Sequence, residues 1–101
     1  MDKKQIKKQL DVFVKRAKKY PGVKKIILYG SAAKKGTHPY DLDLVVIGAF
    51  GSNSPESVLY DMYTDIPRTI DFHVYGALSE QDLPIFIRSS LNESMVLFSK
   101  R

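Results

Sequence analysis

The 101-residue chain contains no cysteine, which excludes a disulfide framework, a thiol nucleophile and a cysteine-based zinc site. It has no apolar stretch long enough to span a bilayer, and its first residues lack the apolar centre of a signal peptide. We therefore expect a cytoplasmic protein that does not associate with membranes. An apolar fraction of 44% and a charged fraction of 27% are typical of a globular protein. This length suits one hydrophobic core, so residues 1–101 are predicted to form a single domain.

Positive charge is concentrated at the start of the chain. Of the 16 lysine and arginine residues, ten lie within the first 25 positions, and the net charge is +5. The simplest interpretation is a solvated helix face. The alternative is a surface that attracts nucleic acid or an acidic partner. Nucleic acid is the less favoured partner, because the segment lacks Arg-Gly repeats and the interleaved aromatic residues of a single-strand binder.

Hydrophobic periodicity and turn residues divide the chain into alternating helices and strands. The pattern predicts helices over 3–19, 54–63 and 79–91, a brief helix over 31–35, and strands over 23–29, 41–48, 68–75 and 95–99. The alternation is too short for a full Rossmann fold. We expect an α/β (α+β) fold, with a small mixed β-sheet and helices packed mainly on one face.

Capping residues set the expected ends of these helices. Ser31 is predicted to cap the brief helix and Gly36 to end it in a left-handed conformation. Ser54 followed by proline predicts the start of the next helix. Ser79 is predicted to cap the last helix, with Pro84 tolerated near its start.

Three aspartates interrupt apolar, strand-like runs, where a carboxylate is unfavourable unless its charge is compensated. Asp41 and Asp43 are two residues apart, so on a strand their side chains leave the same face, about 6–7 Å apart along the chain. Asp71 joins them if its strand lies beside theirs. Carboxylates at this spacing suit hard cations such as Mg²⁺, and bound cations would keep the acids ionised. Two such ions would clamp both oxygens of a phosphoryl displacement.

A small-residue turn lies directly before the acidic pair. Gly30 lets the backbone approach a phosphate, and the amides that begin a short helix at Ser31 would bind phosphate oxygens. Lys34 and Lys35 are placed to neutralise a triphosphate tail. Each signal is common by chance, since Gly-Ser is usually a turn and most Asp-x-Asp pairs are surface acids or caps. Their order and spacing together favour a nucleotide and metal site.

At these residues the chain resembles the minimal nucleotidyltransferases of the DNA polymerase beta-like superfamily, and in particular the antitoxins of HEPN/MNT toxin–antitoxin pairs. The shared features are an apolar strand that ends in Gly30-Ser31, a loop, Asp41 and Asp43 opening a second strand, and Asp71 on a later strand. The loop here has nine residues, one fewer than in many antitoxin members. The resemblance covers nearly the whole chain. It implies a polymerase beta palm-like fold.

The resemblance also implies roles for these residues and for partners. Gly30, Ser31 and Lys34 would bind the nucleotide phosphates, and Asp41, Asp43 and Asp71 would form a catalytic two-metal Mg²⁺ site. The implied reaction transfers a nucleoside monophosphate, such as AMP from ATP, to a hydroxyl. The implied acceptor is a tyrosine of a HEPN-domain toxin, and a homo-oligomer is left open.

Two other interpretations stay open beside this enzyme. The chain is alternatively a non-catalytic antitoxin or adaptor that masks a partner by contact, or a basic nucleic-acid-binding protein that acts through its lysine-rich helix. The apolar residues Ile85, Phe86 and Leu91 are interpreted as core or as a patch facing a partner. His38 and His73 are more simply explained as residues without a catalytic role.

Overall fold

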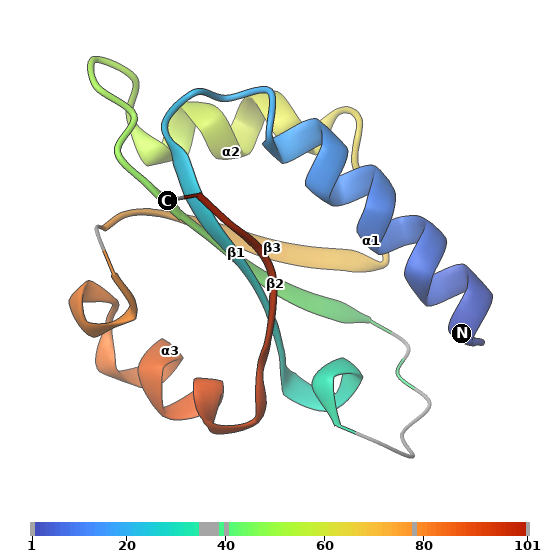
Figure 1. Ribbon diagram of the computed structural model, residues 1–101. Coiled ribbons are helices and arrows are strands. Elements are labelled where there is room, and N and C mark those ends of the chain that lie inside the picture. The colour runs from blue at the N-terminus through green and yellow to red at the C-terminus, as the bar shows by residue number, and fades with distance from the viewer. Residues whose placement is uncertain (1, 35–38, 40, 78, 101) are drawn as a thin grey trace.

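Four strands form a single mixed sheet in the computed structural model, which describes residues 2–34, 39, 41–77 and 79–100 (Figure 1). Their order across the sheet is β3-β2-β1-β4, and their bounds are β1 (Val23–Tyr29), β2 (Leu42–Gly48), β3 (Ile70–Gly76) and β4 (Met95–Ser99). Strand β1 pairs antiparallel with β2 and β4, whereas β2 and β3 run parallel. The expected mixed sheet is confirmed.

The two longer helices lie on one face of this sheet (Figure 1). Helix α1 (Lys3–Ala17) begins with a capping box between Asp2 and Gln5, and it buries Phe13 and Ala17 against the strands. Helix α2 (Pro55–Tyr63) begins at the predicted place, with Ser54 accepting a hydrogen bond from the backbone amide of Ser57. The expectation that helices pack mainly on one face is confirmed for these two helices.

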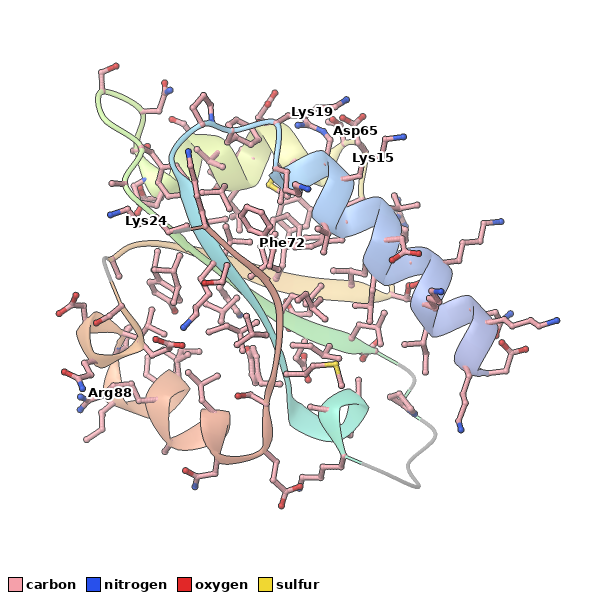
Figure 2. All side chains as sticks on the ribbon, in the orientation of Figure 1. Lys15, Lys19, Lys24, Asp65, Phe72 and Arg88 are labelled. Carbon is pink, nitrogen blue, oxygen red and sulfur yellow. The ribbon has the colours of Figure 1, made fainter. Side chains whose placement is uncertain are left out.

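The apolar core on this face is built around Phe72 (Figure 2). Its ring lies 5.1 Å from that of Phe13 on α1 and 5.2 Å from that of Tyr63 on α2, measured between ring centroids. The alternating residues of β3 explain this placement, because Phe72 points to the helices while its neighbours in sequence point to the opposite face. Arg16 of α1 forms ion pairs with Asp61 of α2 and with Asp65, which follows α2.

The opposite face is covered by short helical turns from the last quarter of the chain. They are the 3₁₀ turns η2 (Glu80–Asp82) and η3 (Ser89–Glu93) and, between them, α3 (Ile85–Arg88). Leu83 and Ile87 are buried there against Ile27, Val45 and Ile47 of the sheet. This second core explains why β2 is apolar on both faces.

The prediction of one continuous helix from Ser79 to Leu91 is wrong. Leu83 and Pro84 have extended ψ angles of 155° and 146°, which separate η2 from α3, and the Ser79 side chain makes no capping hydrogen bond. Proline disfavours the helical conformation in the residue before it and has no amide hydrogen to donate. The helical pattern therefore breaks at Leu83–Pro84.

The apolar residues Ile85, Phe86 and Leu91 were interpreted as core or as an exposed patch, and the structure contains both kinds. Leu91 packs against the second core, whereas the side chains of Ile85 and Phe86 are exposed by 73% and 64%. Among the described residues, no helix has the length and apolarity that crossing a membrane requires.

Candidate nucleotide and metal site

The turn after β1 is the first component of the site. It is a 3₁₀ turn, η1 (Gly30–Ala33), and it begins with Gly30 at a φ of 74°. This is the left-handed region, in which a residue with a Cβ is strained. The prediction that Ser31 caps this helix is wrong, because the turn starts one residue earlier: Tyr29 occupies the capping position and makes no side-chain cap hydrogen bond.

Ser31 instead lies inside the turn, with its side chain exposed. Lys34 closes the turn, and its backbone amide donates to the carbonyl of Ser31 at 3.1 Å. Lys34 is also exposed, on the same short segment as the amides that were expected to bind phosphate. The predicted helix end at Gly36 lies outside the described residues, as do Lys35, His38 and Tyr40.

The acids come together because β2 and β3 are parallel neighbours. Asp43 and Asp71 are direct partners in the register of these strands. Asp41 lies just before β2, where the amide of Leu42 donates to the carbonyl of Thr69 at 2.8 Å and holds the start of β2 against β3. The condition set for Asp71, that its strand lie beside the strand of Asp43, is therefore met.

Gly30 connects the turn to the acids. A Cβ added to Gly30 would lie 2.7 Å from Oδ2 of Asp43, closer than two such atoms approach in proteins. The carboxylate of Asp43 therefore packs directly on the backbone of the turn. Glycine is required at this position for two reasons, its φ angle and this close approach.

The region around Asp43 carries uncompensated negative charge. Burial, followed by the nearby carboxylates of Asp71 and Asp41, raises the pKa of Asp43, while His73 opposes this effect. Within the described ranges, none of these three acids forms an ion pair with lysine, arginine or histidine. Such a cluster of carboxylates attracts a cation.

Tyr29 belongs to the same region, although the sequence analysis assigned it no role. It pairs with Asp43 across β1 and β2. Burial, and then the charges of Asp43 and Asp71, raise the pKa of Tyr29 to about 12. The signal that could have revealed it is its position directly before Gly30, at the end of a strand.

Carboxylate oxygens are ligands that magnesium prefers, although these side chains alone do not complete a coordination shell. In residues 2–34, 39, 41–77 and 79–100, no three His, Cys, Asp or Glu side chains are grouped so that they could hold a metal ion. Magnesium does not require such a cage, since it commonly binds one or two carboxylates together with substrate phosphates and water. Asp43 and Asp71, together with a phosphate held at Gly30, would match that pattern.

A cavity of about 540 Å³ opens beside these acids at the β3 edge of the sheet. Asp41 and Asp71 line it together with Arg68 and Tyr63. The cavity has the size of a small-molecule site, and its described lining combines acidic groups with a cationic residue and two aromatic residues. No local sequence pattern predicts this cavity, because its shape depends on how the loop before β3 folds back against β3.

His73 shares its strand face with Asp71, as the alternation of β3 predicts. Its ring is partly buried and lies 6.3 Å from the ring of Tyr75, centroid to centroid. Among the residues that the structure describes, no hydrogen bond joins His73 to an acid of the site. That His73 has no catalytic role stays a prediction.

Comparison with known proteins gives structural matches only. No protein-family model matches the chain, and no curated protein matches its sequence. A candidate nucleotidyltransferase from Sulfolobus solfataricus matches with a TM-score of 0.60 and 14% identity, over 99% of this chain and 91% of that protein. A toxin–antitoxin structure with AMP-PNP matches with a TM-score of 0.60 and 12% identity, over 90% of this chain and 73% of that one.

A third match is the MntA-HpeT toxin–antitoxin in a mutant form with two aspartates replaced by glutamate. Its TM-score is 0.57 and its identity 11%, over 90% of this chain and 73% of that one. At identities between 11% and 14%, these likenesses show the fold alone. The chain has a minimal nucleotidyltransferase-like fold, as the resemblance in its sequence implied.

Proposed function

We propose that this protein is a magnesium-dependent nucleotidyltransferase that transfers a nucleoside monophosphate to a hydroxyl group. One observation carries this proposal: the Gly30 turn packs directly on Asp43, which is the register partner of Asp71. The turn whose backbone would bind phosphate and the two acids therefore lie at one end of the sheet. The fold shared with nucleotidyltransferase-like structures supports the same conclusion.

The proposal assigns metal binding, phosphate binding and proton acceptance to different residues. Asp41, Asp43 and Asp71 would hold Mg²⁺. The bound ions would neutralise phosphate charge and stabilise the attacking and leaving oxygens. The backbone amides of the η1 turn, together with Ser31 and Lys34, would bind the phosphate oxygens. Asp71 would accept the proton of the acceptor hydroxyl, because its exposed carboxylate faces the cavity that the acceptor would enter.

ATP is the proposed nucleotide and a partner protein the proposed acceptor. One structural neighbour was solved with AMP-PNP, an ATP analogue, and two neighbours are toxin–antitoxin structures. The resemblance in the sequence points to a tyrosine of a HEPN-domain toxin.

Intact-mass spectrometry of the protein and its co-purifying partner, incubated with Mg-ATP, tests this proposal. We expect the partner to gain one or more AMP units, and we expect Asp43→Asn to abolish the gain. Asp11→Asn is the matched control, because it removes the same charge from an exposed position on α1. Equal modification of the partner by wild type and Asp43→Asn would contradict the catalytic assignment.

The alternative function is a non-catalytic antitoxin or adaptor that masks its partner by contact. The exposed side chains of Ile85 and Phe86 favour this contact function, because exposed apolar side chains are typical of a surface that binds a partner. They lie on α3, and η3, which follows α3 directly, contacts the η1 turn. Neutralisation of the partner in cells separates the two functions. If Asp43→Asn still neutralises the partner while Phe86→Ser does not, contact rather than nucleotide transfer is responsible.

A further inference from the structure

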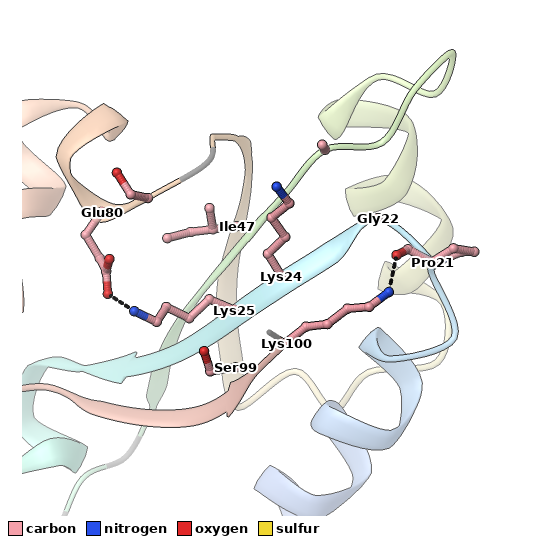
Figure 3. A pocket seen from close by; sticks show the side chains of 10 residues that line it. Pro21, Gly22, Lys24, Lys25, Ile47, Glu80, Ser99 and Lys100 are labelled. Atoms are coloured by element: carbon pink, nitrogen blue, oxygen red, sulfur yellow. Dashed lines mark hydrogen bonds and ion pairs between the residues drawn. The ribbon is translucent and has the colours of Figure 1, made fainter.

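A second cavity, of about 490 Å³, lies at the opposite end of the sheet from Asp43 (Figure 3). It forms where β1 begins and where β2 and β4 end. Among the described residues, its polar lining consists of three lysines, one glutamate and two serines: Lys24, Lys25, Lys100, Glu80, Ser79 and Ser99. These residues come from segments far apart in the sequence, so the fold itself assembles the cavity.

A β-bulge directs two consecutive lysines into this cavity. In a regular strand, Lys24 and Lys25 would point to opposite faces of the sheet. In β1, however, Val23 pairs with Gly48 and Lys25 pairs with the adjacent Ile47, so Lys24 is an extra residue opposite β2. Both lysines consequently line the cavity. Bulges of this kind commonly redirect a side chain towards a functional site.

Close backbone packing fixes the shape of this end of the sheet. A Cβ added to Gly48 would lie 2.3 Å from the carbonyl oxygen of Gly22, and one added to Gly22 would lie 2.1 Å from that of Ala49. The amide of Ala49 donates to Gly22 at 2.9 Å in the same contact. The backbone beside the cavity is thus held tightly, as expected of a binding site that is formed before its ligand arrives.

Charge at this end is positive and only partly compensated. Lys25 Nζ lies 2.6 Å from Glu80 Oε1, and this contact lowers the pKa of Glu80. Among the described residues, neither Lys24 nor Lys100 makes an ion pair, and Lys100 Nζ reaches only the carbonyl of Pro21 at 3.5 Å. The described lining thus contains three lysines and a single glutamate, and only the Lys25 ammonium reaches that glutamate, which leaves positive charge to attract an anion (Figure 3).

We propose that this cavity binds a small polyanion of the phosphate class, held by Lys24 and Lys100 with hydroxyl donors from Ser79 and Ser99. In the described part of the chain, the lining contains no aromatic ring on which a base of single-stranded nucleic acid could stack, so a small molecule is favoured over a nucleic acid. The site needs no metal. It is independent of the proposed transfer reaction, which would take place at the other end of β1.

Isothermal titration calorimetry in EDTA, at low salt, tests the proposal with inorganic tripolyphosphate as the probe. Without a divalent cation the acids around Asp43 repel anions, so binding under these conditions reports the basic cavity. We expect the double variant Lys24→Gln/Lys100→Gln to weaken binding at least tenfold. The matched control, Lys4→Gln/Lys8→Gln, removes the same charge from exposed positions of α1 and should change Kd less than twofold.

Three further arms make the outcome decisive. Asp43→Asn should bind tripolyphosphate like wild type, which separates this site from the proposed active site. Titration with ATP in EDTA distinguishes an organic phosphate from an inorganic one as the preferred ligand. Absence of tripolyphosphate binding, equal weakening in both lysine pairs, or tighter binding of an oligothymidylate than of tripolyphosphate would each overturn the proposal. Thermal melts of each variant confirm that its fold is retained.

Discussion

The two ends of the central strand β1 carry opposite charges, although the strand between them is apolar. At its start, Lys24 and Lys25 line a cavity with one carboxylate. At its end, Tyr29 and Gly30 lie against Asp43, which faces two more acids. Under the two proposals, the basic end would attract an anion without a metal ion, whereas the acidic end would need a cation before it could accept a phosphate.

The same comparison shows two uses of glycine. At the basic end, Gly22 and Gly48 bring backbone against backbone, which fixes structure. At the acidic end, Gly30 brings the backbone against a carboxylate, and under the proposed function this contact joins the turn that would bind phosphate to a group that would bind metal. The first arrangement serves packing, and the second places two chemical functions in contact.

The largest expected effect is the loss of nucleotide transfer when the acidic end loses a charge. Asp43→Asn should lower the transfer rate by about 10³-fold or more, because metal-assisted stabilisation contributes several kcal/mol and about 1.4 kcal/mol corresponds to a factor of ten. Rates are measured by the release of pyrophosphate. Asp11→Asn should stay within twofold of wild type, and a Asp43→Asn rate equal to that of the control would remove Asp43 from the mechanism.

Gly30→Ala should have the next largest effect, because it combines a strained φ with the approach to Asp43. We expect about 1–3 kcal/mol of lost stability together with loss of Mg-nucleotide binding. Gly51→Ala is the matched control: Gly51 has a φ of 63°, but no atom lies within 4 Å of the added Cβ. Chemical denaturation should therefore show a smaller loss for Gly51→Ala, with nucleotide binding intact. Equal losses of stability and of nucleotide binding in the two variants would show that the contact between Gly30 and Asp43 has no special role.

A smaller effect concerns stability without metal. Because burial and neighbouring acids raise the pKa of Asp43, its ionised form destabilises the fold, and stability falls as the pH rises through this raised pKa. Asp43→Asn should raise Tm at pH 7 by on the order of 2 °C, after allowance for the screening of a partly exposed charge. Mg²⁺ should raise the Tm of wild type and not that of the variant. A lower Tm for Asp43→Asn in EDTA would contradict this description of the acidic end.

The smallest effect is expected at alkaline pH. The pKa of Tyr29 is raised to about 12 from an ordinary value of 10.0, so the folded protein holds this proton more tightly than the unfolded chain does. The corresponding stability is present below pH 10 and is lost as the pH rises from about 10 to 12. Tyr29→Phe should flatten this decline in denaturation experiments, whereas the exposed control Tyr60→Phe should not. An unchanged slope for Tyr29→Phe would place the source elsewhere.

Much of the fold follows from local signals in the sequence. Strand β1 has the predicted bounds because an apolar run is enclosed by Pro21-Gly22 and Gly30. Helix α2 begins where Ser54 and Pro55 predict it. In both cases the residues that determine the boundary lie next to it in the chain.

The features that depend on distant pairing could be predicted only conditionally or not at all. The adjacency of Asp43 and Asp71 required a parallel pairing of β2 with β3, which no local pattern specifies. The bulge that turns Lys24 into the basic cavity depends on the register with β2. The sequence did not predict the helix break at Pro84, because residues on both sides of this proline have a helical pattern.

Broadening of backbone amide NMR signals by Mn²⁺, a paramagnetic substitute for Mg²⁺, tests the central claim most directly, because it locates the cation in the sheet. With Mn²⁺ and an ATP analogue present, signals of Gly30, Asp43 and Asp71 should broaden first, and those of Lys24 and Ser99 should persist. Asp43→Asn should remove the effect. Broadening that begins at the basic end, or that is the same in wild type and Asp43→Asn, would contradict a metal and nucleotide site at the acidic end.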